Sequence, residues 1–240
     1  MNVFDEMGVY WAEIADQNQT SRQLQFLKNI LKHDELALDF ECGTGRHLIP
    51  LSKEGFNIVG LDVSVNLLRI AKSRWHNAVL VRADMRFLPF KPKTFADVIS
   101  MDTSFGYLPS EQDDLQSLNE LRAAMVSGGI FIVDVFNREH LMKRFKVYSQ
   151  PEWKDYPSFL LLQERTVDVD GQKLRDIWTV RDRADGQIRV FEHIARLYEL
   201  KRLQKLLEKA CFKTNSIYGD YEGQSFSPES SRLILIANAE

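Results

Sequence analysis

Short apolar runs alternate with stretches of helical spacing through the first part of the chain. Five such runs predict buried strands, at residues 36–40, 57–61, 78–82, 95–101 and 130–136. Between them hydrophobic residues recur three and four positions apart, and Ser64 and Ser110 are placed to cap two of the intervening helices. Strands that alternate with helices in this way predict a doubly wound, mostly parallel sheet.

The pattern changes in the second half of the chain. From Phe159 to Tyr198 it predicts three long strands with alternating hydrophobic positions, and Asp170-Gly171 and Asp185-Gly186 fall at the two turns. Asp-Gly pairs favour tight hairpins, so we expect an antiparallel three-stranded meander.

These two patterns divide the chain into three parts. We expect residues 1–149 to form an α/β core and residues 150–199 to form an antiparallel insertion that serves as a lid or substrate platform. Residues 200–240 would then return to the core with a helix and two closing strands, around residues 214–221 and 232–237.

The ten residues LALDFECGTG (36–45) carry the strongest chemical signal. They lead from a buried strand into a turn with Gly43 and Gly45, and the next strand ends directly at Asp62. Glycines let the backbone approach a ligand closely, and an acid at the end of the second strand can accept hydrogen bonds from ribose hydroxyls. This order of elements therefore indicates a nucleoside site.

Two features of this loop disfavour a dinucleotide and a nicotinamide-dependent oxidoreductase. The dinucleotide fingerprint ends on Gly or Ala, whereas Leu48 occupies that position here. Asp39 and Glu41 also place two carboxylates beside the helix N-terminus that would receive a pyrophosphate. Like charge opposes a diphosphate there, so the loop favours a cofactor with a sulfonium and an ammonium.

In this loop the chain resembles the class I S-adenosylmethionine-dependent methyltransferases. That family has D-x-G-x-G-x-G, and here the loop reads Asp39-Phe40-Glu41-Cys42-Gly43-Thr44-Gly45, with Glu41 in place of the first glycine. Residues 81–90, 96–108 and 128–141 are similar to the family's third, fourth and fifth strand elements. The resemblance implies a Rossmann-like seven-stranded sheet of order 3-2-1-4-5-7-6, with the last strand antiparallel, and S-adenosylmethionine as the cofactor.

The resemblance also implies a cofactor site. Asp62 and Val63 would contact the ribose, Asp84 and Met85 the adenine, and the backbone near Met101 the ammonium. The full set of expected cofactor-binding residues is Asp39, Glu41, Gly43, Gly45, Arg46, Asp62, Val63, Asp84, Met85, Met101, Asp102 and Tyr10. Arg46 could pair with Glu41, with Asp39 or with the cofactor carboxylate, and Tyr10 could instead be a packing residue.

Methyl transfer from a sulfonium is an in-line displacement in which a neutral thioether leaves, so the protein mainly orients the acceptor and excludes water. A general base is optional for a neutral amine and matters more for a hydroxyl; the candidates are Asp102, Tyr107 and His47. Four residues of the meander could face a substrate, without an assigned catalytic role: Trp178, His193, Arg196 and Tyr198. We expect a small-molecule methyl acceptor. An RNA or protein methyltransferase and a non-catalytic S-adenosylmethionine-binding protein remain alternatives.

Composition further limits the classes of binding partner that we expect. The net charge is −3 with both signs interspersed, which disfavours nucleic acid. No apolar run is long enough to span a membrane and the N-terminus does not resemble a signal peptide, so we expect a cytoplasmic protein without a membrane partner. Cys42 and Cys211 lack metal-ligand spacing, so we expect no metal and two reduced, buried thiols. Edge strands of the meander could mediate a homodimer, so the chain is expected to be a monomer or a homodimer.

Overall fold

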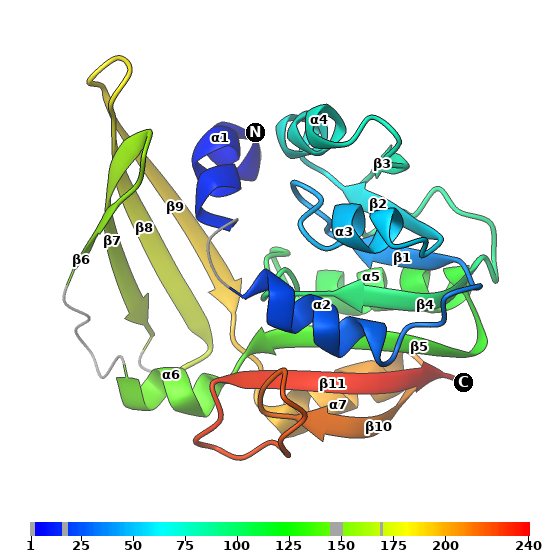
Figure 1. Ribbon diagram of the computed structural model, residues 1–240. Helices are drawn as coiled ribbons and strands as arrows, with labels where there is room; N and C mark the ends of the chain where they lie inside the picture. The colour runs from blue at the N-terminus through cyan, green and yellow to red at the C-terminus, as the bar shows by residue number, and fades with distance from the viewer. Residues whose placement is uncertain (1–2, 16–18, 145–150, 169) are drawn as a thin grey trace.

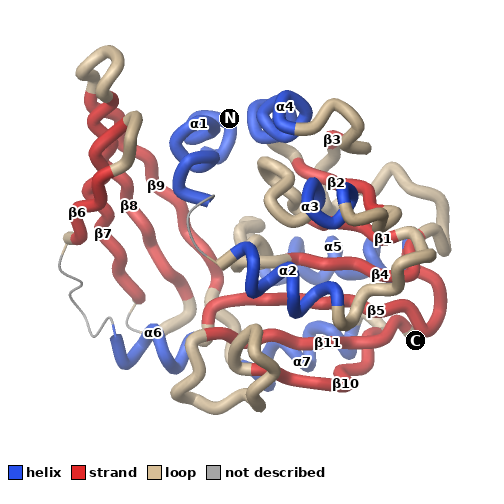
Figure 2. Tube along the Cα trace, in the orientation of Figure 1, coloured by secondary structure: helices blue, strands red, loops and turns tan. Residues whose placement is uncertain are grey.

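The computed structural model describes residues 3–15, 19–144, 151–168 and 170–240. These residues form a seven-stranded mixed sheet covered by helices on both faces, with a separate four-stranded antiparallel sheet beside it (Figures 1 and 2). Helix α1 (Val3–Ala15) lies between the second sheet and the core. No helix among the described residues has the length and apolar character needed to cross a bilayer.

The large sheet has the predicted order. Its strands are β1 (Ala37–Phe40), β2 (Ile58–Asp62), β3 (Leu80–Arg82), β4 (Phe95–Ser100), β5 (Met125–Phe136), β10 (Phe212–Tyr218) and β11 (Arg232–Ala239). They are arranged β3-β2-β1-β4-β5-β11-β10, and β11 runs antiparallel to both of its neighbours. The predicted fold class, including the antiparallel last strand, is confirmed.

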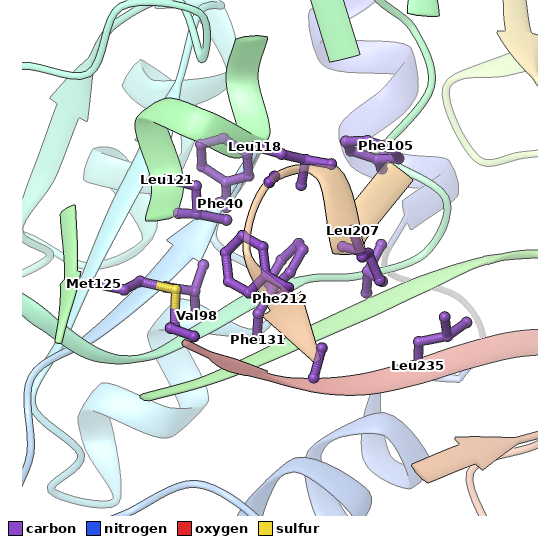
Figure 3. Packing of buried hydrophobic residues seen from close by; sticks show 14 of the residues in the cluster. Phe40, Val98, Phe105, Leu118, Leu121, Met125, Phe131, Leu207, Phe212 and Leu235 are labelled. Carbon is purple, nitrogen blue, oxygen red and sulfur yellow. The ribbon is translucent and has the colours of Figure 1, made fainter. Parts of the chain in front are cut away.

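Strand alternation assigns the side chains of the sheet to two hydrophobic layers. In β11, Leu233 and Leu235 join the layer covered by α5 and α7, whereas Ile234 and Ile236 join the layer covered by α2 and α3. Figure 3 shows the first layer. The helices are α2 (Thr20–Lys28), α3 (Leu48–Lys53), α4 (Val65–Arg74), α5 (Glu111–Ala124) and α7 (Leu200–Lys209). Each fully buried leucine or isoleucine contributes about 1.5–3 kcal/mol, so these layers fix the sheet that carries the loops.

Local sequence signals account for most helix boundaries. The Ser64 hydroxyl accepts a hydrogen bond from Leu67 N at the start of α4, and Ser110 forms a capping box with Asp113 at the start of α5. Helix α5 ends at Ala124 rather than at the glycine pair of residues 128–129, because β5 already begins at Met125 and includes both glycines.

The second sheet contains one strand more than the sequence predicted. Its strands are β6 (Glu152–Asp155), β7 (Phe159–Val167), β8 (Lys173–Asp182) and β9 (Ile188–Arg196), in that order. The three-stranded meander corresponds to β7, β8 and β9. Strand β6 was missed because it is short and largely polar; it pairs antiparallel with residues 160–163 of β7. Helix α6 (Arg138–Arg144) precedes this sheet.

The structure tests the predicted burial of the two cysteines but not the predicted domain boundaries. Cys42 is buried, but Cys211 is exposed, so its predicted burial was wrong. Cys211 adopts a left-handed φ of 59° just after α7, where the chain turns outward into β10. The predicted division of the chain at residues 150 and 200 stays a prediction, and its first boundary lies outside the described residues.

Helix α1 joins the two sheets. Met7 and Tyr10 pack with Phe159 and Trp178 of the second sheet in a small hydrophobic cluster of their own. On its other side Asp5 accepts a hydrogen bond from the Ser64 hydroxyl at 2.6 Å, at the cap of α4. The N-terminal helix is therefore held by both the core and the insertion.

Candidate functional site

The loop between β1 and α3 adopts a left-handed backbone at three positions. Glu41, Gly43 and Gly45 have φ values of 67°, 52° and 75°. Glycine suits two of these positions, and at Gly45 an added Cβ would also lie 2.9 Å from Ile49 Cδ1. Glu41 adopts the same conformation although it carries a side chain, which costs of order 1 kcal/mol or more.

Two buried acids hold this loop in place. Asp62 Oδ2 accepts a hydrogen bond from Gly43 N at 2.8 Å, and its Oδ1 accepts one from Ser64 N at 2.8 Å. Asp39 Oδ2 accepts one from Leu48 N at 3.1 Å. Burial raises the pKa of Asp39 to about 7, and burial also raises the pKa of Asp62 against the opposing effect of its N–H donors.

A cavity of about 660 Å³ opens at the carboxyl ends of the parallel strands, between the large sheet, α1 and β9. This is where ligands collect in open α/β sheets. Among the expected cofactor residues, those that line it are Glu41, Gly43, Asp62, Val63, Asp84, Met85 and Asp102. The tertiary structure thus brings together acids from four successive strand ends.

Other expected cofactor residues lie outside the cavity lining. Asp39 and Met101 are buried beneath it, and Gly45 packs against Ile49. Burial, together with the hydrogen bond that the Tyr10 hydroxyl donates to Asp182 at 2.5 Å, raises the pKa of Tyr10 to about 12. Its neighbour Trp11 lines the cavity instead, because adjacent helical residues face different directions.

Arg46 pairs with neither Glu41 nor Asp39, the two protein partners considered from the sequence. Its guanidinium forms an ion pair with Asp102 at 2.8 Å and donates to Gln23 and Thr20 at 2.6 and 3.1 Å. Burial acts to raise the pKa of Asp102, but the charges of Arg46 and Arg232 outweigh it and hold the pKa below its usual value. Asp102 is therefore an anion at neutral pH.

The three candidate bases differ in their positions. Asp102 and Tyr107 line the cavity. His47 does not: its Nε2 lies 2.9 Å from Gln23 Oε1, and burial lowers its pKa to about 3. A neutral imidazole held in this way beneath the loop has a packing role.

A buried polar network, which the sequence did not reveal, fixes the loop after β4. Asp134 accepts hydrogen bonds from Asp102 N at 2.9 Å and from Arg232 Nε at 2.8 Å, and Arg232 donates to the Thr103 hydroxyl at 2.9 Å. Asp102 and Thr103 have left-handed φ values of 58° and 65°. Acids and an arginine inside otherwise apolar strands were the available signal, but their partners are far apart in sequence.

Aromatic rings form the wall of the cavity opposite the loop. The Phe4 ring lies 5.6 Å from Trp11, 5.1 Å from Tyr107 and 5.8 Å from His193, measured between centroids. His193 comes from β9, and its Nε2 lies 3.7 Å from the buried carboxylate of Asp176. Helix α1, the loop after β4 and the second sheet each contribute to this wall.

Asp176 and His193 interrupt the apolar inner face of the second sheet. The Asp176 carboxylate accepts hydrogen bonds from Gln163 Nε2 at 2.7 Å, Arg165 Nε at 2.7 Å and Trp178 Nε1 at 2.9 Å. Burial lowers the pKa of His193, so its imidazole is neutral at neutral pH. Within the described residues its Nδ1 is buried without a hydrogen-bond partner.

Comparison with known proteins identifies the domain that carries this cavity. Residues 37–129, from β1 into β5, match the family model described as a methyltransferase domain. The chain is a class I S-adenosylmethionine-dependent methyltransferase. This methyltransferase is 28% identical over 230 residues to a glycine/sarcosine N-methyltransferase of Parasynechococcus marenigrum, covering 91% of this chain and 78% of that protein.

Solved structures share the fold of this methyltransferase. The CcbJ methyltransferase of Streptomyces caelestis has a TM-score of 0.84 at 18% identity, covering 98% of this chain and 96% of that one. The amino pentose methyltransferase CalS10 of Micromonospora echinaspora, with S-adenosylmethionine bound, has a TM-score of 0.72 at 18% identity, covering 97% of each chain. The predicted family, enzyme class and cofactor are confirmed.

The residues of the cavity suit S-adenosylmethionine chemically. The cofactor carries a sulfonium, an ammonium and ribose hydroxyls, and the cavity presents the carboxyl groups of Glu41, Asp62, Asp84 and Asp102. Burial raises the pKa of both Glu41 and Asp62, the mark of carboxyl groups short of positive charge. A cationic ligand would supply such charge.

Proposed function

We propose that this methyltransferase transfers the methyl group of S-adenosylmethionine to the nitrogen of a small-molecule amine. The carrying observation is that one cavity joins the acidic glycine loop to the aromatic wall of Phe4, Trp11, Tyr107 and His193. When bound, the cofactor supplies an electrophilic methyl group. The protein orients the acceptor, excludes water from the reacting atoms and removes a proton from the acceptor.

The acidic side of the cavity is assigned to the cofactor. Asp62, whose carboxylate already orders the loop, accepts hydrogen bonds from the ribose, with Val63 beside it. Asp84 and Met85 are assigned to the adenine end. Asp102, an anion fixed by Arg46, is assigned to the ammonium. These three assignments, to the adenine, the ribose and the ammonium, follow the order β3-β2-β1-β4 along the carboxyl edge of the sheet.

The aromatic side is assigned to the acceptor. Aromatic faces stabilise an ammonium by about 0.5–2 kcal/mol, so they favour the positive charge that develops when an amine nitrogen is methylated. We assign to His193, which lines the cavity with a neutral imidazole beside Asp176, the uptake of the proton that the methylated nitrogen loses. The Asp176 carboxylate would then stabilise the imidazolium.

Named relatives support a nitrogen acceptor. A dTDP-3-amino-3,4,6-trideoxy-alpha-D-glucopyranose N,N-dimethyltransferase of Streptomyces venezuelae is 34% identical over 97 residues, 40% of each chain. Together with the glycine/sarcosine enzyme, it acts by its name on an amine. The net charge of −3 continues to disfavour nucleic acid as the acceptor.

The test measures S-adenosylhomocysteine formation from S-adenosylmethionine with matched pairs of small amines and alcohols. These include amino acids with their hydroxy acids, and amino sugars with their parent sugars. The proposal expects turnover with members of the amine set only. Trp11→Ala and His193→Gln should lower kcat/KM by about tenfold or more, whereas Trp153→Ala, at an exposed tryptophan outside the cavity, should not. Turnover with alcohols alone, or cofactor binding without turnover on any acceptor class, would contradict it.

A further inference from the structure

Glu41 is the feature of the cavity that the common properties of the family leave unexplained. It replaces a glycine in the loop, keeps a left-handed φ of 67° and lines the cavity. Strained residues with side chains persist where the surroundings hold them, and they cluster at ligand sites. Both the left-handed backbone of Glu41 and its buried carboxyl group cost stability. This cost indicates that the carboxyl group has a role at the ligand.

The carboxyl group of Glu41 lies among other acids. Its Oε2 accepts one hydrogen bond, from the Ser100 hydroxyl of β4 at 3.2 Å. After burial, the charges that act on it most strongly are those of Asp62 from β2, Asp114 from α5 and Asp39 from β1, all negative. Burial and these carboxylates raise the pKa of Glu41 well above its usual value.

The neighbouring acids each have donors of their own. Asp62 accepts two backbone N–H groups, and Asp39 accepts that of Leu48. Asp114 accepts the Tyr198 hydroxyl at 2.6 Å and is paired with Arg196. From the loop after β4, Tyr107 also faces Glu41, and burial raises the pKa of this phenol, so it stays neutral. Among these groups Glu41 is the carboxyl that depends most on a ligand for positive charge.

We propose that Glu41 makes the cavity favour the sulfonium cofactor over its neutral thioether product, because the residue releases its proton when the sulfonium binds. The inference rests on the assignment of the cofactor to this cavity. In the step, the Glu41 carboxyl O–H bond breaks, the proton leaves to bulk buffer, and the carboxylate pairs with the positive charge of the ligand. S-adenosylhomocysteine lacks the sulfonium charge and drives this ionisation less.

The proposed role of Glu41 makes the affinity for the cofactor depend on pH. A ligand that binds the ionised form better gains affinity as pH rises through the titration of Glu41. Affinity for S-adenosylmethionine therefore rises with pH more steeply than affinity for S-adenosylhomocysteine. After methyl transfer the charge that held Glu41 ionised is gone, the residue takes back a proton, and the product is held less tightly.

The test is calorimetric titration of the full chain with each of the two ligands, in phosphate and in Tris, whose different ionisation heats report proton release. Two variants probe the residue. Glu41→Gln removes the charge but keeps an oxygen for Ser100, and Glu41→Gly restores the residue that adopts this backbone most readily. Asp97→Asn is the matched control: Asp97 is a buried acid with raised pKa on β4, outside the cavity lining, and it accepts Lys32 N at 2.7 Å.

In the wild type, S-adenosylmethionine should release more protons than S-adenosylhomocysteine, by up to about one per site, and the ratio of the two affinities should rise with pH. Both Glu41 variants should lower that ratio by about tenfold or more, since an opposite charge at contact shifts such equilibria by a pKa unit or more. The variants should also lose the difference in proton release, and Asp97→Asn should keep both properties.

The outcomes separate the two levels of the argument. If both ligands bind the Glu41 variants with the wild-type affinity ratio and proton release, this inference is overturned and the cofactor assignment stands. If neither ligand binds the folded wild type, the cofactor assignment fails and the inference falls with it. Far-UV circular dichroism and thermal unfolding of each variant establish that it is folded before titration.

Discussion

Arg46 and Asp102 form an ion pair of 2.8 Å that links the loop after β1 to the loop after β4. The two residues are 56 positions apart in sequence. The same guanidinium donates a hydrogen bond to Gln23 of α2, so three segments meet at one side chain. Asp102 has a left-handed φ, and its backbone N–H donates a hydrogen bond to Asp134. The pair thus fixes one side of the cavity.

Replacing Arg46 with Ala should weaken cofactor binding by about tenfold, because Asp102 loses the charge that orients it and lowers its pKa. Stability should fall by about 1–3 kcal/mol: the pair with Asp102, whose side chain is 44% exposed, is screened by solvent, but Gln23 and Thr20 lose the guanidinium that donates to them. Calorimetry and urea unfolding measure the two effects. Arg46→Lys should recover part of the affinity, and wild-type binding by the alanine variant would refute this role.

Asp62→Ala should reduce affinity for S-adenosylmethionine and S-adenosylhomocysteine by at least about tenfold. The change removes the proposed ribose acceptor and leaves the N–H groups of Gly43 and Ser64 without their partner, which costs about 1–3 kcal/mol. Calorimetry with NAD as a third ligand should show no binding to either protein. Unchanged adenosyl binding in the variant would mean that the cofactor has been assigned to the wrong end of the strand.

Gly106→Ala should destabilise the protein by about 2–4 kcal/mol. Gly106 has a φ of 108°, and an added Cβ would lie 2.8 Å from the backbone oxygen of Arg196 in β9. Gly106 O also accepts a hydrogen bond from Arg196 N at 2.8 Å, so neither the loop after β4 nor β9 can move away without losing this bond. Acceptor turnover should fall too, because Tyr107 follows directly.

Gly186→Ala provides the control for that experiment. Gly186 also has a positive φ, 70°, but an added Cβ meets no atom within 4 Å. Its cost should be limited to the left-handed backbone, about 1–2 kcal/mol. Chemical unfolding of the two variants under the same conditions compares their free energies of unfolding. Equal losses of stability would show that the contact of residue 106 with β9 does not contribute to the cost.

Asp39 should make the cofactor-free protein less stable as pH rises from about 4 to about 7. Its pKa is about 7 in the folded chain against an ordinary 3.8, so the folded state keeps a proton that the unfolded state releases. The stabilisation is fully present below the unfolded pKa and is lost as pH rises toward the folded one, by up to about 1.4 kcal/mol per pH unit.

Asp39→Asn should flatten this dependence, since the amide does not titrate and its oxygen can still accept Leu48 N–H. Urea unfolding of wild type and variant across that pH range gives the difference in slope. Identical slopes would show that Asp39 is ionised in the folded protein.

Local chemistry made the core predictable. The strand from residue 36, the glycine pair and Asp62 lie close together in sequence, and each restricts the backbone or charge of its neighbours. The alternation of strand and helix therefore predicted the doubly wound sheet, and the resemblance added the strand order. Strand β6 was missed because four mostly polar residues carry little periodicity; only pairing with β7 makes them a strand.

Some residues of the cavity could likewise be predicted from the sequence, whereas others could not. Asp62, Asp84 and Asp102 each lie at or just after the end of a parallel strand, so strand pairing brings them to one edge of the sheet. Tyr10 was predicted to contact the cofactor, but its neighbour Trp11 lines the cavity, because resemblance does not tell which side of the N-terminal helix faces the ligand. Their roles at the cofactor stay predictions, as do a small-molecule acceptor, a monomer or homodimer, and the cytoplasmic location.

The sequence by itself determined the order of elements, the acidic glycine loop and the preference for a cationic cofactor. The tertiary structure decided that Arg46 pairs with Asp102 and that His193 from the second sheet packs beside Phe4 from α1 in one wall of the cavity. The reason is physical. Backbone preferences and charge act between near neighbours, whereas these contacts depend on how two sheets and a helix pack their hydrophobic faces.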